Sequence, residues 1–254
     1  MRIGAIKTIL CVAALSAVSA MAQADVQAIV ARMVAAQQQA KDNLRAYQAT
    51  RKYQIFKGQE QKSQVTAEVN YEPPQRKSYN IVQSTGGPGE GVIKKTLEHE
   101  VAATRDPHDY EISPANYDFE YAGESDCSSS RCYVLTLKPK RDCKDLIEGH
   151  AWIDQNTYLI RRIEGELAKS PSWWVKKAAV VIEYGAVEGM WIQTKSVADA
   201  KLRMIGDYKL VSQNVELRAA TTEASARRPQ SSFRRRLAHS ALVGEAGFFL
   251  PNRK

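Results

Sequence analysis

The stretch Ile147–Leu217 constrains the fold most, because it has the pattern of one long antiparallel meander. Strand-like runs follow one another through it, namely His150–Asp154, Tyr158–Leu167, Ala178–Val187, Trp191–Ala198 and Leu202–Val215. The segments between them are short and contain residues that tolerate tight backbone angles, as in Asp154–Thr157, Glu188–Gly189 and Asp199–Lys201. A chain that reverses this often predicts a wide, curved sheet, and such a sheet has a concave face.

The first 24 residues predict a cleaved export signal. Two basic residues, Arg2 and Lys7, precede an apolar run that ends at Met21 and closes on Ala22-Gln23-Ala24. A positive start, a short apolar middle and an A-x-A end are the parts of a secretory signal peptide. The run is shorter than the roughly 20 apolar residues of a membrane-spanning helix. We therefore expect a soluble, exported protein that begins at Asp25 and does not span the membrane.

The net charge of +8 belongs to the ends of the chain. Between Asp25 and Leu217 there are 26 basic and 26 acidic residues, so the body is electroneutral and lacks the basic groove of a nucleic-acid-binding protein. The tail Arg218–Lys254 is basic and lacks a regular period, which predicts disorder. Its Arg234-Arg235-Arg236 run either attracts anionic lipid headgroups, at about 1 kcal/mol per residue, or is simply solvated. The predicted organisation is a signal peptide at 1–24, one domain at 25–217 and a tail at 218–254.

Three cysteines remain after the signal, at positions 127, 132 and 143. Export places them where thiols oxidise, and three pairings are open. We favour a disulfide between Cys127 and Cys132, because the residues between them form a plausible hairpin tip. Zinc would require closely spaced ligand pairs such as C-x-x-C, which are absent.

The remaining periodicity predicts two helices and further strands. Apolar residues from Val26 to Tyr47 follow helical spacing, and a second helix is predicted over Val92–Thr104. Alternation of period two marks strands within Thr50–Ser84, at Tyr117–Tyr121 and around Tyr133–Leu137. With the meander, this gives roughly ten strands and two helices. The predicted fold is mainly β (α+β): a strongly curved antiparallel sheet that forms an unclosed β-barrel with helical cover.

The sequence shows no pattern of catalytic residues. His99, His108, His150 and His239 are isolated, and none has the H-E-x-x-H spacing of a metal-binding helix. A G-x-S-x-G nucleophile motif is also missing. We therefore expect a protein that is not an enzyme, with no catalytic residues, no metal and no cofactor.

The predicted strands carry more apolar and aromatic area than one layer of sheet needs. For any one residue, an ordinary core position explains the pattern. For the surface as a whole, we favour a cavity in which tyrosine rings cover an acyl chain while their hydroxyls meet water. The candidate lipid-binding lining is Tyr53, Val69, Tyr71, Tyr117, Phe119, Tyr121, Tyr133, Leu135, Trp152, Leu159, Ile163, Val180, Ile182 and Tyr184.

Two motifs carry a family resemblance. Ile147–Asp154 (IEGHAWID) followed by Tyr158–Gly165 (YLIRRIEG) resembles the central hairpin of outer-membrane lipoprotein-sorting proteins, which belong to the LolA-like superfamily of periplasmic lipoprotein carriers. Tyr184-Gly185 through Gly189–Ile192 is similar to the next turn of that pattern. The similarity covers roughly Asp25–Leu217.

The resemblance implies a half-open β-barrel with a helical lid over an apolar cavity. It implies a periplasmic lipoprotein-sorting or carrier-like protein that binds acyl chains of lipoproteins or lipids, with transport partners in the inner and outer membranes. The alternative within the superfamily is an envelope sensor, a regulatory lipid-binding module that contacts a membrane protein. The best-known carriers lock the lid with an arginine, which no motif assigns to a position in this sequence.

Overall fold

The computed structural model describes residues 25–127, 130–171, 173, 175–204 and 206–220. The expected signal peptide and the tail beyond residue 220 lie outside the described residues, whereas Arg218 and Ala219 are the last residues of a strand. No helix in these described ranges is long and apolar enough to cross a membrane.

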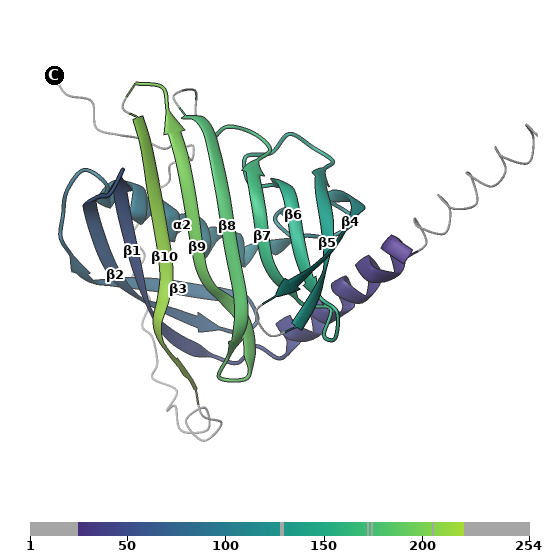
Figure 1. Ribbon diagram of the computed structural model, residues 1–254. Coiled ribbons are helices and arrows are strands. Elements are labelled where there is room, and N and C mark those ends of the chain that lie inside the picture. The colour runs from purple at the N-terminus through teal and green to yellow at the C-terminus, as the bar shows by residue number, and fades with distance from the viewer. Residues whose placement is uncertain (1–24, 128–129, 172, 174, 205, 221–254) are drawn as a thin grey trace, which may run out of the picture.

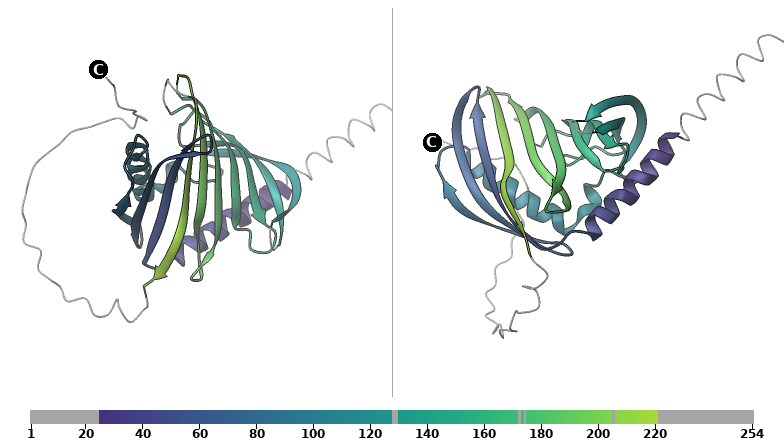
Figure 2. Two further views of the ribbon diagram at one scale, coloured as in Figure 1. Left: turned by 60° about the vertical axis from the view of Figure 1, so that its left-hand side comes forward. Right: turned by 60° about the horizontal axis from the view of Figure 1, so that its bottom comes forward.

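Ten antiparallel strands form one sheet in the order β3-β2-β1-β10-β9-β8-β7-β6-β5-β4 (Figure 1). The strands are β1 Tyr47–Lys57, β2 Glu60–Glu72, β3 Arg76–Ser84, β4 Tyr117–Cys127, β5 Ser130–Pro139, β6 Ile147–Asp154, β7 Ile160–Leu167, β8 Val175–Val187, β9 Met190–Leu202 and β10 Gly206–Ala219. The sheet is strongly curved, and its edge strands β3 and β4 do not pair with each other over the part of the chain that the structure describes (Figure 2). The predicted mainly β, unclosed architecture is confirmed.

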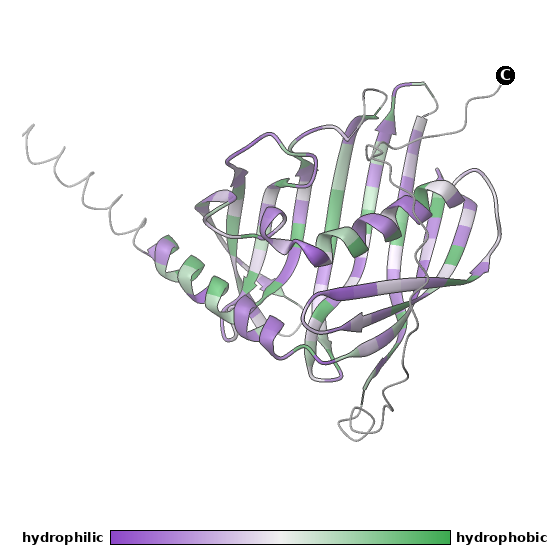
Figure 3. Cartoon of the chain, turned by 180° about the vertical axis from the view of Figure 1, so that it is seen from behind, coloured by the Kyte–Doolittle hydropathy of each residue, from purple (hydrophilic) through white to green (hydrophobic). Residues whose placement is uncertain are grey.

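The helices lie on the concave side of the sheet (Figure 2, Figure 3). Residues 25–42 form the N-terminal helix, which precedes β1. Helix α2 (Glu90–Arg105) and the 3-10 turn η1 (Pro107–Asp109) belong to the segment that joins β3 to β4. Because β3 and β4 are the opposite edges of the sheet, this segment has to cross from one edge to the other, and α2 is the part that spans the concave face.

Each helix buries an apolar cluster against a different part of the sheet. Val26, Val30 and Met33 of the N-terminal helix pack with residues of β4 to β7, including Leu135 and Ile153. The buried residues of α2, Ile93 and Leu97, pack on β1 and β2 through Tyr53, Ile55, Val65, Ala67 and Val69. Tyr208 and Leu210 of β10 pack against the margin of the α2 cluster, whereas the end of β9 belongs to neither cluster.

The predicted turn at Asp199–Lys201 is wrong. These residues belong to β9, which continues to Leu202 and pairs on both sides, with Ala200 opposite Ala178 of β8 and Tyr208 of β10. The chain reverses just after Leu202, where Gly206 has a φ of +88° that favours glycine. The turn at Glu188–Gly189 is confirmed, with φ values of +53° and +74° that match the twist of a hairpin.

Gly149 of β6 and Gly165 of β7 face each other and let the two backbones approach closely. A Cβ atom on Gly149 would lie 2.1 Å from the Glu164 carbonyl oxygen, and one on Gly165 would lie 2.2 Å from that of Glu148. Both glycines belong to the motif that carries the family resemblance. Their role here is steric, because any side chain would collide with the neighbouring backbone.

We expect Gly149→Ala to lower the free energy of unfolding by about 1–3 kcal/mol, the cost of overpacking a filled site. Gly91→Ala is the matched control: it lies in α2, where an added Cβ meets no atom within 4 Å. The control should raise stability by roughly 0.5–1 kcal/mol, because alanine is the better helix former. Urea unfolding of both variants checks the prediction, and equal effects would contradict the steric argument.

The carboxylate of Asp154 organises the turn between β6 and β7. It accepts hydrogen bonds from the backbone N–H groups of Asn156 and Thr157, at 3.0 and 2.9 Å, and from the hydroxyl of Ser130, at 2.6 Å. The Arg161 guanidinium adds two more, at 2.9 and 2.7 Å. Burial alone would raise the pKa of Asp154, but these donors outweigh it and hold the pKa below its usual range.

A carboxyl with a lowered folded-state pKa stabilises the fold above its unfolded pKa and loses that effect as the pH falls through the folded value. At pH 6 we therefore expect Asp154→Asn to be less stable than the wild type by roughly 2 kcal/mol. The difference should shrink steadily once the pH drops below about 4. Urea unfolding at a series of pH values measures it, and a difference that does not change with pH would refute this role of the charge.

Candidate functional site

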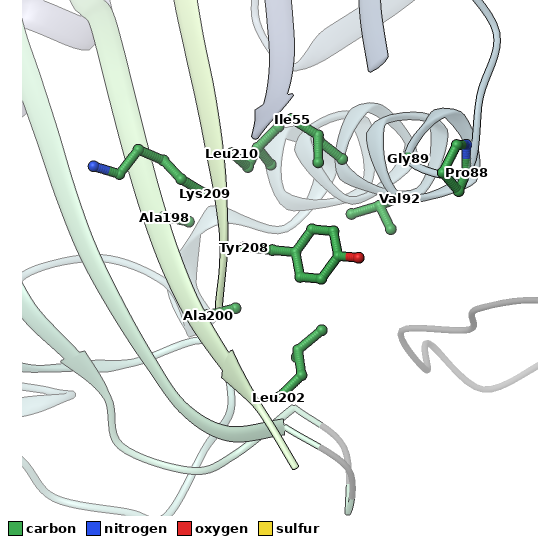
Figure 4. Close-up of a pocket in the computed structure, with 10 residues that line it drawn as sticks. All are labelled: Ile55, Pro88, Gly89, Val92, Ala198, Ala200, Leu202, Tyr208, Lys209 and Leu210. Atoms are coloured by element: carbon green, nitrogen blue, oxygen red, sulfur yellow. The ribbon is translucent and has the colours of Figure 1, made fainter. Parts of the chain in front are cut away.

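An apolar pocket opens where the first turn of α2 meets the ends of β1, β9 and β10 (Figure 4). Its volume is about 600 Å³, including the space open to solvent at its mouth. The lining residues are mostly apolar and come from four segments: Ile55, Pro88, Gly89, Val92, Ala198, Ala200, Leu202, Tyr208, Lys209 and Leu210.

The register of β9 and β10 creates the floor of this pocket. Ala200 lies opposite Tyr208, and Ala198 lies opposite Leu210, so these side chains share the concave face. Alanine fills little of the space, which gives the floor its depth. The Tyr208 ring points into the centre of the pocket toward Val92 of α2 (Figure 4).

Gly89 fixes how closely α2 approaches the sheet. A Cβ atom at this position would lie 2.8 Å from Cδ1 of Ile55 and 3.1 Å from Cβ of Ser63. Because Gly89 has none, the N-terminal end of α2 rests directly on β1 and β2. The contact of Gly89 with Ile55 and Ser63 therefore forms one boundary of the pocket.

Two lysines lie near the pocket, and they differ in their partners. The Lys57 ammonium lies over the Tyr208 ring, 5.7 Å from its centroid, which is a cation–π contact at the rim. Lys209 contributes to the wall, but its ammonium points away from the Tyr208 ring and pairs with Asp199 at 3.5 Å (Figure 4). The interior is thus apolar, and positive charge lies at its edge.

Farther along α2, Glu100 ties the helix to the sheet. Its carboxylate pairs with Arg51 of β1 at 2.7 Å and with Lys77 of β3 at 3.3 Å, and it accepts a hydrogen bond from the Tyr53 hydroxyl. Arg51 also donates to the hydroxyl of Ser212 on β10 at 3.1 Å. One carboxylate therefore links α2 to β1 and β3, and through Arg51 to β10.

Burial shifts the pKa of two members of this group. Burial, with the nearby Glu100 charge, raises the pKa of the Tyr53 hydroxyl well above its usual value, so this group stays a neutral donor. Burial lowers the pKa of Lys77, and the Glu100 carboxylate opposes that change. The group holds α2 in place and presents no free nucleophile.

The structure distributes the fourteen candidate lining residues over several environments. Tyr53 and Val69 are buried under α2, whereas Tyr117, Leu135 and Ile163 are buried under the N-terminal helix. Partly buried side chains surround the second group, namely Phe119, Tyr133, Val180, Ile182 and Tyr184. None of the fourteen lines the pocket of Figure 4, and their role in lipid binding stays a prediction.

Four of the fourteen lie apart from both clusters. Tyr71 is buried and stacks on Tyr47, with ring centroids 5.2 Å apart. Tyr121 is exposed, and Leu159 is partly buried beside the turn before β7. Trp152 alternates with the buried Ala151 and Ile153, so it lies on the convex face, where Arg162 covers its ring.

Sequence reasoning missed the pocket's own floor, although a signal for it was present. Residues 198–202 alternate apolar and polar side chains with period two, as a strand does. The mistaken turn at Asp199–Lys201 hid this alternation, and with it Ala200 and Leu202. The alternation would have placed Ala198, Ala200 and Leu202 on one face.

The remaining candidates for chemistry are dispersed. His99 lies 3.6 Å from Asp145, the exposed His108 lies 3.9 Å from Glu111, and His150 lies beside Trp152. Among the described residues, no group of three or more His, Cys, Asp or Glu side chains could hold a metal ion. The structure joins Cys127 to Cys132 by a disulfide, the favoured pairing, and Cys143 is a free thiol.

No family model matches the sequence, and a search of the curated proteins finds no match. Solved structures similar to this chain include a DUF1329 family protein from Desulfovibrio piger, 13% identical over 78% of this chain and 94% of that one, with a TM-score of 0.44. A LolA superfamily protein from Nitrosomonas europaea is 9% identical over 79% and 96%, with a TM-score of 0.44. A domain described as an outer membrane lipoprotein-sorting protein, from Vibrio parahaemolyticus, is 11% identical over 75% and 92%, with a TM-score of 0.44.

Two of these three names are those of the family that the sequence motifs resemble. At such identities the likeness concerns the fold alone.

We expect Glu100→Gln to destabilise the fold by about 3 kcal/mol, because Arg51 and Lys77 would keep their charges in a site with little access to water. Amide hydrogen exchange should also become faster in α2 than in β8. Glu98→Gln, on the exposed face of the same helix, is the matched control and should change neither quantity. A Glu100 variant as stable as the control would show that the apolar contacts of α2 hold it without the charges.

Proposed function

We propose that this chain is a periplasmic carrier or binding protein that buries an acyl chain of a lipoprotein or lipid in the pocket between α2 and strands β9 and β10. The observation that carries the proposal is the pocket itself, which is concave, apolar and bounded by a helix that crosses the sheet. The mechanism is reversible burial of a hydrocarbon chain, without covalent chemistry.

The lining of the pocket supports this class of ligand. Small-molecule sites are lined mainly by apolar side chains. Leu202, Leu210 and Val92 offer aliphatic surface, and the Tyr208 ring offers a flat wall. Each methylene moved from water into such a site contributes about 0.8 kcal/mol, so a chain of several methylenes would be retained.

The attachment of α2 supports a lid that opens at the pocket. The charged group around Glu100 fastens the C-terminal half of the helix, where Arg51 and Lys77 converge. At the N-terminal end, Gly89 and Val92 contact the sheet through apolar surface, and the polar contacts include a hydrogen bond from the Ser63 hydroxyl to the Gly86 carbonyl oxygen and one between Glu90 and Ser84. A small displacement of that end would widen the pocket while the Glu100 contacts remain formed.

Export is supported by the predicted signal peptide and by the disulfide between Cys127 and Cys132, since disulfides persist in oxidising compartments. A carrier would exchange its cargo with transport partners in the inner and outer membranes. A sensor would instead form a stable complex with one membrane protein. Mass spectrometry of the material that co-purifies with the protein distinguishes the two: lipoproteins would favour the carrier, and one membrane protein in a stable complex would favour the sensor.

Ala200→Phe should fill the pocket floor and weaken the binding of a fluorescent fatty acid by roughly tenfold or more, because several methylenes would lose their site. Ala179→Phe is the matched control: it lies on the next strand opposite Asp199, on the other face of the sheet. Fluorescence titration of the wild type and both variants measures the affinities. A wild type that binds no fatty acid would overturn the proposal.

A second set of variants tests where on the concave face the acyl chain binds. Phe119 and Tyr121 belong to the lining predicted from the sequence and lie on β4, far along the sheet from β9. Loss of binding on replacing both by glutamate, with Ala200→Phe unaffected, would move the acyl site to the cluster under the N-terminal helix. The opposite result would support the pocket beside α2.

A further inference from the structure

Two large apolar side chains project from loops at the end of the sheet where the pocket lies. Trp173, in the loop before β8, is 78% exposed, and Met204, in the turn after β9, is 84% exposed. These are the largest exposed fractions among the large apolar side chains that the structure describes. We call this end of the inner strands the Trp173–Met204 edge, which is distinct from the edge strands β3 and β4. It comprises Lys169, Trp173, Lys176, Lys201, Arg203 and Met204.

The two loops are joined to each other and to the pocket. The Nε group of Arg203 donates a hydrogen bond to the Trp173 carbonyl oxygen at 2.8 Å. Val175, the first residue of β8, pairs with Leu202, the last residue of β9, and Leu202 lines the pocket. Figure 1 shows the start of β8 and the end of β9 at the same margin of the sheet. The Trp173–Met204 edge is therefore the rim of the pocket on this side.

Basic residues flank Trp173 and Met204 along the chain. Lys169, Lys176, Lys201 and Arg203 are all exposed, and the segment 168–177 contains no acidic residue. The nearby carboxylates are few: Glu166 pairs with Lys177, and Asp207 lies across from Lys201 in the register. The edge thus combines protruding apolar groups with an excess of positive charge.

We propose that the Trp173–Met204 edge docks this protein on an anionic lipid bilayer. Tryptophan prefers the boundary between headgroups and acyl chains, where its ring is partly apolar and its N–H can reach water. Basic residues beside it are attracted by anionic lipids, and each strengthens binding roughly fivefold near such a surface. The charge of the edge is complementary to this partner.

A protein partner fits the edge less well. Protein interfaces need about 1,000 Å² of well-packed surface, and lysine is depleted from their cores. Among the described residues of this edge, the exposed large apolar side chains are two tips that stand among basic residues, not a broad flat patch. A bilayer can accept isolated tips, because its lipids rearrange around them.

Docking by this edge would bring the pocket mouth to the lipid surface. If the pocket holds an acyl chain, as proposed above, that chain could leave or enter a bilayer without crossing water. This consequence depends on the proposed function, whereas the docking itself does not. The two can be tested separately.

The test is flotation of the exported protein, made from the full chain, with vesicles of phosphatidylcholine alone or with added phosphatidylglycerol. The wild type should bind the anionic vesicles and bind less at high salt. Replacing both Trp173 and Met204 by serine should weaken binding about tenfold or more, as expected for the loss of two inserted apolar groups. Lys169→Gln with Lys176→Gln should weaken it roughly fivefold per residue.

Matched controls remove exposed apolar side chains or exposed positive charges elsewhere on the molecule. Val82 and Val215 are exposed valines on β3 and β10, and replacing both by serine should leave vesicle binding unchanged. Arg76→Gln with Arg105→Gln removes two charges where β3 begins and α2 ends, and should also have no effect. The changed side chains are all exposed, and circular dichroism verifies that each variant folds.

Three results would overturn the proposal. The first is a wild type that binds neither kind of vesicle. The second is a Trp173/Met204 variant that binds like the wild type, which would assign binding to another segment such as Arg234–Arg236. The third is capture of a membrane protein through this edge without vesicle binding. Ala200→Phe should still dock, so a failure of acyl binding and a failure of docking are distinguishable.

Discussion

The position of the two edge strands decides the rest of this structure. β3 and β4 follow each other along the chain but lie at opposite edges of the sheet, so one connection has to cross the whole concave face. A crossing segment exposes many backbone groups, and a helix satisfies them internally. α2 is that helix. It covers β1 to β3 through Ile93 and Leu97, and its first turn meets the ends of β9 and β10 around the pocket.

The contacts of α2 divide along its length between polar and apolar ones. Near its C-terminal end, Glu100 compensates the charges of Arg51 and Lys77, which would be costly without a partner in a site with little water. Near its N-terminal end, Gly89 rests on Ile55, and Val92 faces Tyr208 across the pocket. The side of the helix that faces the pocket is therefore apolar, and the charged contacts between helix and sheet lie farther along it.

Much of this fold could be predicted from the sequence, because periodicity determines which residues share a face. The Glu188–Gly189 turn and the alternation of Tyr117 and Phe119 with acidic residues carry that information locally. The pocket could not be predicted in the same way, because alternation does not say which part of a face a helix covers. Tyr53 and Ala200 both lie on the concave side, yet only Tyr53 lies under α2. Trp152 shows the second difficulty: its size suggested a cavity wall, but its strand position places it on the convex face.

The register of β9 and β10 connects the pocket with the Trp173–Met204 edge. A slip of one residue would move Ala198, Ala200 and Leu202 to the convex face and bring their charged neighbours Asp199 and Lys201 to the pocket floor. The same slip would shift the turn that carries Arg203 away from the Trp173 carbonyl oxygen. Pairing of β9 on both sides prevents it, since a slip would have to break its contacts with β8 and β10 together. The long, doubly paired strand that sequence reasoning cut short at Ala198 is thus the element on which both surfaces depend.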